Sequence, residues 1–457
     1  MLSRNRGLMA FYLMAGFTAT AGTTPVPNYP LTLDDAVKLA LRQNANILNQ
    51  IEEIKRNQGL FFQAQAALLP QVQGTGAYSQ QKPTLAESTG VNESWNLQIT
   101  ITQLLWDGGA ALANRRAAEL NEQAAYHALR DTIDSVVETV RIQFYRVVVD
   151  RGLVQVQEEA VNLLRSELDD QQGRRDAGTA TRFDVLQAET QLLNQQPALV
   201  TAQRNYLVAQ ATLAKILGIP AGRQYSSDEP LPISGSLEVR PVQVDLEKAL
   251  AVAHVRRPLL KEDRSKVAAA VANGTAARAG FQPSISANAG LESESNPLGN
   301  DLRDVVNGWQ FGATGQWNIA DGGTTYGKVK AAKSQTEEAN ITLNDTERQV
   351  EVDVFTAVGN LHRAQENMIA AEKGVEVSLH SFSEAYQRRT EGKGSQLDVF
   401  DARTQLTLAR STFLRSEYQY LSAIAQYQYA TGTETTYNDQ FDHAGVHPKT
   451  LTAVPHR

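Results

Sequence analysis

The sequence predicts a mostly α-helical protein with a membrane β-barrel, in a chain built from two tandem copies of one unit. Three observations lead to this fold class. The two halves of the 457-residue chain match each other at a nearly constant offset. Each half contains a long stretch without proline, between Pro83 and Pro197 and between Pro297 and Pro448. Each half also has short segments in which apolar and polar residues alternate.

The tandem repeat is visible as pairs of matched motifs. LDDAVKLA at 33–40 matches LEKALAVA at 246–253 with an offset of 213 residues, and Asp-Gly-Gly at 107–109 matches 321–323 with an offset of 214. Such self-similarity is the signature of a duplicated architecture. We therefore divide the chain into a first repeat (22–218), a proline-rich linker (219–243), a second repeat (244–432) and a C-terminal tail without periodicity (433–457), which we expect to be mobile.

The N-terminus has the pattern of a secretory signal peptide. Arg4 and Arg6 precede an apolar run at 7–17, and Ala-Thr-Ala at 19–21 offers a small-x-small cleavage motif. We therefore expect residues 1–21 to be removed and the mature chain to be exported. An N-terminal membrane anchor is the alternative, but the apolar run of 11 residues is too short to span a bilayer.

Composition excludes several classes of function. The formal net charge is -7 and no basic run is present, which argues against nucleic-acid binding. The chain has no cysteine, so disulfides, thiol catalysis and cysteine-bound metals are excluded. Its seven histidines lack metal-ligand spacing, and the Gly-Gly pairs at 108–109 and 322–323 suit strand-to-helix turns better than phosphate loops. The sequence predicts no catalytic site, metal or cofactor.

Two segments in each half alternate with the period of two that is typical of β-strands. Residues 72–78, 95–102, 285–291 and 309–319 place apolar side chains on one face and Gln, Asn, Ser and Thr on the other. One interpretation of this pattern is a soluble antiparallel sheet with one buried face. An outer-membrane barrel, apolar outside and polar inside, is favoured because all four tryptophans lie in or beside these strands. They form a candidate aromatic girdle: Trp95, Trp106, Trp309 and Trp317.

Each half also contains helices at both ends of its strand pair. An opening helix is expected over 32–68 and 245–279, before Pro70 and Pro283. Residues 108–173 and 322–389 lack turn signals, and a helix of this length would extend about 100 Å. After polar turns, second helices are expected over 182–217 and 396–431. Their large apolar residues recur every seven positions, which is typical of antiparallel coiled coils.

The number of strands limits how such a barrel can close. Four strands per chain are too few, because the smallest outer-membrane barrels have about eight. An open sheet in lipid would leave unpaired backbone groups at its edges. The barrel must therefore be shared, with eight strands in a dimer or twelve in a trimer. Helical hairpins that continue from this sheet would form a tube with a polar inside, which is a duct.

Five motifs carry a resemblance to a known family: LTLDDAVKLAL at 31–41, LLPQV at 68–72, LLWDGG at 104–109, W-N-I-x-D-G-G at 317–323 and LDVFDARTQL at 397–406. With the duplication, they resemble the TolC-type outer-membrane efflux factors over about 31–432. The resemblance implies a homotrimer, with a 12-stranded β-barrel in outer-membrane lipid that continues into a 12-helix coiled-coil tunnel in the periplasm. It also implies docking to a periplasmic adaptor protein and an inner-membrane transporter.

The resemblance also implies roles for residues at the ends of the hairpins. The adaptor-docking tips are Ala177, Gly178 and Thr179 in the first hairpin, and Glu391, Gly392 and Lys393 in the second. A closed-state lock would pair Asp184 with Arg388 or Arg389. Gly394 stands where some family members carry a basic residue. The structural alternative is that glycine and arginine simply suit the C-terminus of a helix.

Asp398 and Asp401 are the sharpest candidate site. They are three residues apart and share one helix face, and the resemblance implies that they line the periplasmic constriction of the pore. Six carboxylates in a trimer would attract multivalent cations. Helix capping is the alternative. Asp184 occupies the equivalent of position 398 in the first repeat, whereas Gln187 occupies the equivalent of position 401, so only the first aspartate is expected to have a structural role.

These observations together predict an outer-membrane channel that exports substrates delivered by an adaptor and a pump. The alternative is an exported periplasmic coiled-coil scaffold without a membrane barrel. It explains the helices and the seven-residue pattern, but not four alternating strands that hold every tryptophan. A wall of Gln, Asn, Ser and Thr selects little, so drugs, metal ions, proteins and oligosaccharides all stay open as cargo.

Overall fold

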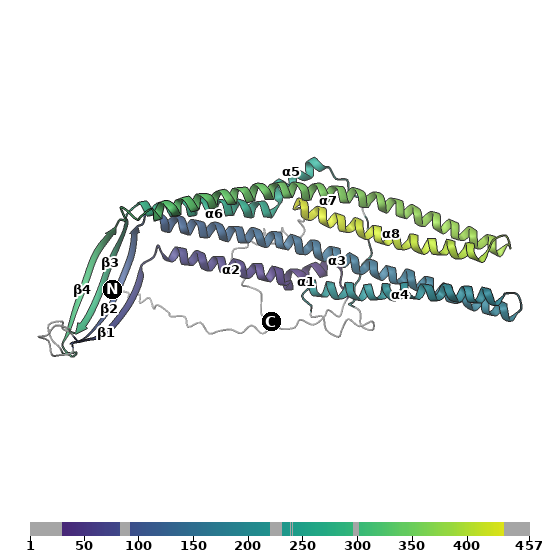
Figure 1. The fold of residues 1–457 in the computed structure, drawn as a ribbon, viewed down its shortest axis with the longest axis horizontal. Helices are drawn as coiled ribbons and strands as arrows, with labels where there is room; N and C mark the ends of the chain where they lie inside the picture. Colours follow the sequence, from purple (N-terminus) through teal and green to yellow (C-terminus); the bar gives the residue numbers. More distant parts are fainter. Residues whose placement is uncertain are drawn as a thin grey trace, which may run out of the picture.

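The computed structural model describes residues 30–82, 92–219, 231–237, 239, 241–295 and 301–433. The signal peptide expected at 1–21, residues 220–230 of the linker and residues 434–457 of the tail lie outside these ranges. The described chain is a long bundle of helices with a small sheet at one end (Figure 1). None of the helices in these ranges has an apolar stretch that is long enough to cross a bilayer.

The two repeats contain the same α-helices and strands in the same order. The first has α1 (Leu33–Gln43), α2 (Ala45–Ala66), β1 (Gln71–Gln81), β2 (Asn92–Trp106), α3 (Ala110–Asp176) and α4 (Arg182–Ile216). The second has α5 (Leu246–Arg256), α6 (Pro258–Arg278), a short 3-10 helix (Ala279–Phe281), β3 (Ser284–Ser295), β4 (Val305–Gln316), α7 (Thr324–Thr390) and α8 (Gln396–Thr431). The expected helical hairpins are therefore present, with ends within a few residues of the predicted ones.

The opening of each repeat differs from the prediction, because two helices replace the single helix expected over 32–68 and 245–279. Asn44 ends α1 and caps α2, where its side chain accepts a hydrogen bond from the backbone of Asn46 at 2.9 Å. Pro258 occupies the first turn of α6, where a missing N–H costs nothing. A helix-capping residue and a proline therefore interrupt two segments whose apolar pattern alone indicates continuous helices.

Each Asp-Gly-Gly motif forms the turn between the second strand of its repeat and the long helix that follows, as the sequence predicts. The carboxylate of Asp107 accepts hydrogen bonds from the backbone of Gly109 at 3.1 Å and Ala111 at 2.7 Å. Asp321 does the same for Gly323 and Thr325. The second glycine of each motif has a positive φ, 84° in the first repeat and 90° in the second, which disfavours other residues. α3 and α7, each of 67 residues, begin here.

The four strands form one antiparallel sheet in the order β1-β2-β3-β4. The register sets Trp95 opposite Tyr78, and Leu291 opposite both Ile99 and Trp309. Directly opposite residues share a face of the sheet. Most large apolar residues of the four strands therefore lie on one face and most Gln, Asn, Ser and Thr residues on the other, as the alternation predicts. Leu104 and Val306 are exceptions, since they lie opposite Ser286 and Glu294 on the polar face.

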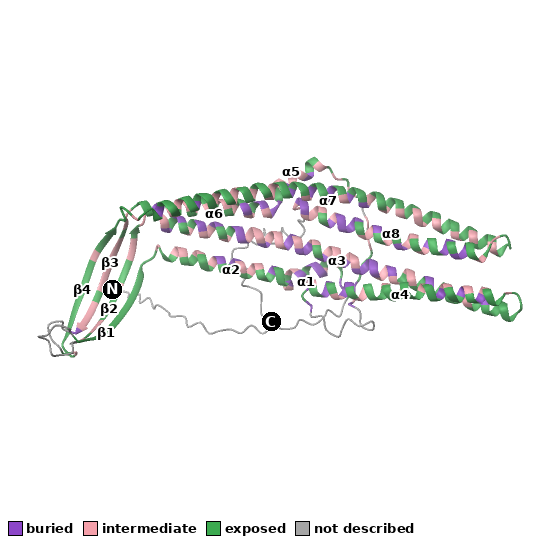
Figure 2. Cartoon of the chain, viewed as in Figure 1, coloured by how far each residue is buried: buried purple, intermediate pink, exposed green. Residues whose placement is uncertain are grey.

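Burial is unevenly distributed along the molecule (Figure 2). The largest core lies between α1, α2, α3 and α4 and includes Val37, Ile54, Val137 and Leu213, each at most 1% exposed. The apolar face of the sheet, in contrast, is open: Trp309 is 80% exposed. The chain therefore buries the core of its helices itself, whereas the apolar face of the sheet is left for another environment.

Candidate functional site

The four tryptophans lie at two levels of the sheet. Trp95 and Trp309 belong to the parts of β2 and β4 remote from the helices, whereas Trp106 ends β2 and Trp317 directly follows β4, beside the helices. The indole N–H of Trp95 donates to the carbonyl of Leu302 at 3.0 Å, and that of Trp317 donates to another backbone carbonyl. Two levels of aromatic residues are typical of the two interfaces of a membrane.

A β-bulge adjusts the position of Trp106. The pairing of β2 with β3 shifts between Leu104 and Trp106, which sets Trp106 opposite Ile285. Regular alternation would place Trp106 with Thr102 on the polar face, whereas the extra residue of a bulge reverses the facing of the residues after it. The bulge thus returns this tryptophan to the apolar face.

The two hairpin tips are built alike and lie at the end of the bundle remote from the sheet (Figure 1). Gly178 has φ 77° and Gly392 has φ 73°. The next residue then closes the turn: the N–H of Thr179 donates to Arg174, and that of Lys393 donates to Arg388, both at 2.8 Å. All six residues predicted at the tips are exposed: Ala177, Gly178, Thr179, Glu391, Gly392 and Lys393.

Asp184 and Asp398 each complete a capping box after the tip. The carboxylate of Asp184 accepts from the backbone N–H and the hydroxyl of Thr181, both at 2.7 Å. Asp398 accepts from the backbone of Ser395 at 2.9 Å, and its own N–H donates to the serine hydroxyl. The bonds from Thr181 hold the pKa of Asp184 below its ordinary value. Both aspartates therefore have the structural role that the repeat comparison predicts, whatever further role they have.

Asp398 and Asp401 line one groove on the second hairpin, as their spacing of three residues predicts. The groove lies between α7 and α8 and has a volume of about 420 Å³. Arg388 and Glu384 line its α7 side. Three carboxylates and one guanidinium thus share this groove, which gives it a negative balance.

Arg388 and Arg389, which the sequence groups together, contact different surroundings. The guanidinium of Arg389 forms an ion pair with Glu167 of α3, with an Nη2–Oε1 distance of 3.1 Å. Gln171 donates to the same carboxylate at 2.9 Å, and Gln396 of α8 also donates to it. Burial alone would raise the pKa of Glu167, but these three hydrogen bonds together hold it below its ordinary value. Within the chain, Arg389 thus pairs with Glu167, while Asp184 is held by Thr181.

A second arginine is buried beside this pair. Arg403 of α8 is 7% exposed, and its guanidinium lies 5.7 Å from the ring centre of Phe382 in α7. Burial lowers its pKa. Together with Glu167 and Arg389, this side chain lies where the two hairpins of the chain meet near their tips.

The contact between the two hairpins, formed by Glu167, Arg389, Gln396 and Arg403, was not predicted from the sequence. Arg403 lies within the LDVFDARTQL motif, but no role was predicted for it. Glu167 and Gln396 belong to no motif, and Glu167 is 222 positions from Arg389. Their one signal is asymmetry between the repeats, since Ser381 stands at the equivalent of Glu167. A polar difference at a single position of a long amphipathic helix is too common to predict a contact.

Comparison with known proteins gives a consistent family. The sequence profile of the family described as outer membrane efflux protein matches residues 36–219 and 249–433, one match per repeat. The chain is 24% identical to the outer membrane efflux protein BepC of Brucella suis over 88% of this chain and 86% of BepC. It is 25% identical to the toluene efflux pump outer membrane protein TtgF of Pseudomonas putida over 85% and 80%.

Comparison with solved structures also finds outer-membrane channels. The crystal structure of the Campylobacter jejuni CmeC outer membrane channel superposes with a TM-score of 0.78, at 18% identity over 89% of this chain and 88% of CmeC. Similarity to outer-membrane efflux proteins supports the interpretation as an export channel. The alternative, an exported coiled-coil scaffold, would be compatible with the helices alone. The chain belongs to the outer membrane efflux protein family and is an outer-membrane channel for export.

Proposed function

We propose that three copies of this chain form one exit duct, in which a shared 12-stranded barrel continues into a 12-helix periplasmic tunnel. The observation that carries the proposal is the sheet, whose four strands turn most of their large apolar residues to one exposed face. β1 and β4 are its edges among the described strands. A sheet in lipid must pair its edges, so β1 of one copy would pair with β4 of the next until the ring closes.

The tips are the surface that would meet the partners. They lie farthest from the sheet (Figure 1), and all six of their residues are exposed. We place the periplasmic adaptor on both tips, with the inner-membrane transporter beyond it. The transporter would supply the energy, since this sequence has no nucleotide-binding motif.

An export assay tests this function. Cells that lack the gene should become sensitive to toxic compounds exported by the partner transporter, and the wild-type chain should restore resistance. Thr179→Glu combined with Lys393→Glu should reach the outer membrane in normal amounts but fail to restore resistance. Full restoration by this variant would contradict docking at the tips, whereas a wild-type chain found only in the soluble periplasmic fraction would contradict the duct itself.

Asp398 and Asp401 would form the cation-attracting constriction of the closed duct. Their shared groove carries a negative balance with Arg388 as its cation. Carboxylates repeated around a narrow pore favour multivalent cations and oppose anions. In the same closed state, Asp184 of one protomer would pair with Arg388 of a neighbour. Arg388 is the better partner, because Arg389 is already paired with Glu167.

Cargo would be selected by the transporter rather than by the duct. TtgF is named for toluene efflux, yet the polar face of the present sheet consists mainly of Gln, Asn, Ser and Thr. Such neutral side chains form no pocket that would select an apolar solvent over another solute. Exchanging the partner transporter should therefore change the exported compounds without any change in this chain.

A further inference from the structure

Arg403, on α8 near the second tip, is a buried arginine whose side chain has no polar partner. The residue is 7% exposed, and its Nε and Nη1 are buried with no hydrogen-bond partner in the described chain. Its guanidinium forms no ion pair with any described residue and lies 5.7 Å from the ring centre of Phe382 in α7. A buried charge without a polar partner is costly, so the position of this side chain needs a physical reason.

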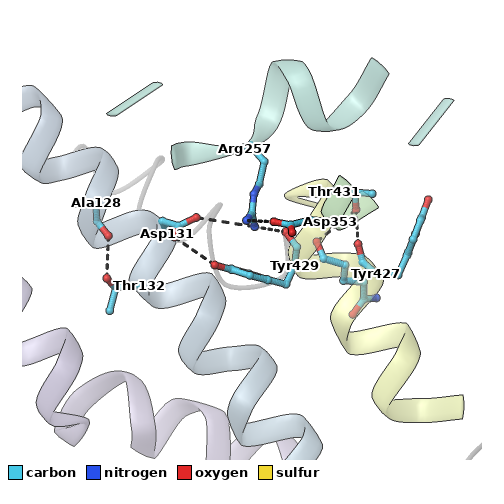
Figure 3. Close-up of polar contacts among 9 residues, drawn as sticks. Ala128, Asp131, Thr132, Arg257, Asp353, Tyr427, Tyr429 and Thr431 are labelled. Atoms are coloured by element: carbon cyan, nitrogen blue, oxygen red, sulfur yellow. Dashed lines mark hydrogen bonds and ion pairs between the residues drawn. The ribbon is translucent and has the colours of Figure 1, made fainter. Parts of the chain in front are cut away.

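Arg257 shows how the chain accommodates a buried arginine elsewhere (Figure 3). Its side chain is 3% exposed. It donates to the backbone carbonyl of Tyr429 in α8 at 2.7 Å, and it forms long ion pairs with Asp131 of α3 at 3.9 Å and Asp353 of α7 at 3.8 Å. Buried arginines are usually paired in this way. Arg403 differs from Arg257 because the chain supplies no acceptor for it.

The hairpin itself does not require an arginine at this position. Glu189 occupies the equivalent place in the first repeat, 214 residues earlier on α4, and it is exposed. The same kind of helix therefore packs against its partner with a residue of opposite charge that points to solvent. The buried guanidinium is a feature of the second hairpin alone.

Arg403 lines two pockets between the hairpins, and Leu163 of α3 lines both of them as well. One pocket, which extends past Glu167 and Arg389, is a polar groove with a volume of about 420 Å³. The other has a volume of about 160 Å³, and we call it the apolar pocket after the side chains that form most of its wall. They are Val156, Ala160 and Leu163 of α3, Leu379 and Phe382 of α7, and Leu406 of α8. A concave apolar wall with very few charged groups is typical of small-molecule sites.

The other charged residues that line the two pockets form ion pairs with one another. These pairs are Arg410–Glu159 at 3.2 Å, Arg389–Glu167 at 3.1 Å and Arg174–Asp170 at 3.7 Å. Burial lowers the pKa of Arg403, but an arginine stays charged in proteins. Each pair cancels its own charge, so the residues that line the pockets leave one positive charge, on Arg403.

We propose that the apolar pocket binds a small organic monoanion, whose carboxylate pairs with Arg403 and whose apolar body contacts the α3 and α7 walls. Its volume of about 160 Å³ is close to that of cavities that hold one benzene molecule, about 150 Å³. An inorganic anion would leave the apolar wall without contacts, and a neutral molecule would leave the guanidinium unpaired. A carboxylate with one ring or a short chain satisfies both parts of the site.

A bound carboxylate should also hold the two hairpins together. The wall of the apolar pocket comes from α3 in the first hairpin and from α7 and α8 in the second. A ligand that contacts all three helices binds best when the hairpins are in contact, so by mass action it stabilises that arrangement. The site needs one copy of the chain and does not depend on how the copies assemble.

Titration of the purified full-length protein with para-fluorobenzoate tests the site. Fluorine NMR of the probe reports binding, and para-fluorobenzamide is the uncharged probe of nearly the same shape. The acid should bind at least about tenfold more tightly than the amide, because it alone offers a charged acceptor to the guanidinium. Equal affinity of the two probes would contradict the proposal without any change in the protein.

Three variants assign the binding to Arg403. Arg403→Gln should weaken the acid about tenfold and leave the amide unchanged. Glu159→Gln releases Arg410 from its ion pair at the rim of the same pocket, so the acid should bind more tightly than to the wild type. Arg363→Gln is the matched control, since this exposed arginine of α7 contacts Asn360 outside the pocket. The proposal is wrong if Arg403→Gln binds the acid as tightly as the wild type does, or if Arg363→Gln weakens it equally.

Hydrogen exchange locates the bound probe and separates binding from a structural role of the arginine. The acid should slow exchange in peptides that cover 376–386 and 400–410, but not in a peptide of α7 that covers 340–350. Arg403→Gln should exchange no faster than the wild type in the absence of the probe, because it removes an unpaired buried charge. If that variant does not fold, the comparison of acid with amide in Glu159→Gln decides. Protection that is confined to other parts of the chain would exclude this pocket as the site.

Discussion

Asp398 and Asp401, near the second tip, are expected to have two separable roles, one structural and one electrostatic. Asp398 accepts the N–H of Ser395 in a capping box, whereas Asp401 is exposed one turn later. Asp398→Ala should therefore lower the free energy of unfolding by about 1 kcal/mol, the usual net contribution of one hydrogen bond. Asp401→Ala should change it by less than about 0.5 kcal/mol. Local hydrogen exchange of residues 395–400 measures the difference.

The effects of the two alanine variants on cation block should not follow their effects on the free energy of unfolding. If both carboxylates line the constriction, each alanine variant should weaken the block of single channels by trivalent cations added on the periplasmic side of a lipid bilayer. The double variant should show the largest loss and a higher conductance. A double variant with unchanged block would leave Asp398 with capping as its sole role.

The lock between protomers is also a prediction about individual residues. Asp184→Arg or Arg388→Asp alone should raise the conductance of the closed channel, because each places like charges opposite one another. The double exchange should restore low conductance. Arg389→Asp is the matched control: it breaks the ion pair with Glu167 in the same chain, so Asp184→Arg should not rescue it. Rescue of Arg389→Asp instead of Arg388→Asp would reverse the assignment.

Among the elements, the hairpin turns depend on a backbone conformation that can be tested with two glycines five residues apart. Gly178 has φ 77°, where a Cβ is strained by about 1 kcal/mol. Gly173 lies within α3, and a Cβ added there has no atom within 4 Å. Gly178→Ala should speed the exchange of the Thr179 and Ala180 amides about fivefold, whereas Gly173→Ala should slow local opening by a similar factor. Equal effects of the two variants would contradict the turn geometry.

The elements also show what the sequence makes predictable. Ends of long helices were predictable because capping residues and glycines mark them, as at Gly178, Gly392 and the Asp-Gly-Gly motifs. The sheet faces were predictable because alternation has a period of two in every regular strand, and the bulge before Trp106 interrupts it. The contact of Glu167 with Arg389 was not predictable, because it depends on how two hairpins from different repeats cross.

At the scale of the whole molecule, the open sheet is the part that most clearly requires other copies of the chain. Its central strands are paired within the chain, and its apolar face is exposed along all four strands. The helices, in contrast, have buried cores of their own. Assembly in the membrane should therefore depend on the pairing of β1 with β4 between copies. The absence of cysteine from the chain allows this pairing to be tested with introduced cysteines alone.

Cysteines at Thr75 in β1 and at Gln310 or Gly312 in β4 should form disulfides between protomers, because all three positions face the polar side of the sheet. Oxidised samples should then show covalent dimers and trimers on denaturing gels, with no larger species because the ring closes. Val72→Cys combined with Gln310→Cys is the control, since opposite faces do not meet in any register. Cross-linked species that stop at the dimer would support an eight-stranded barrel, and cross-links of the control pair would exclude β1–β4 pairing.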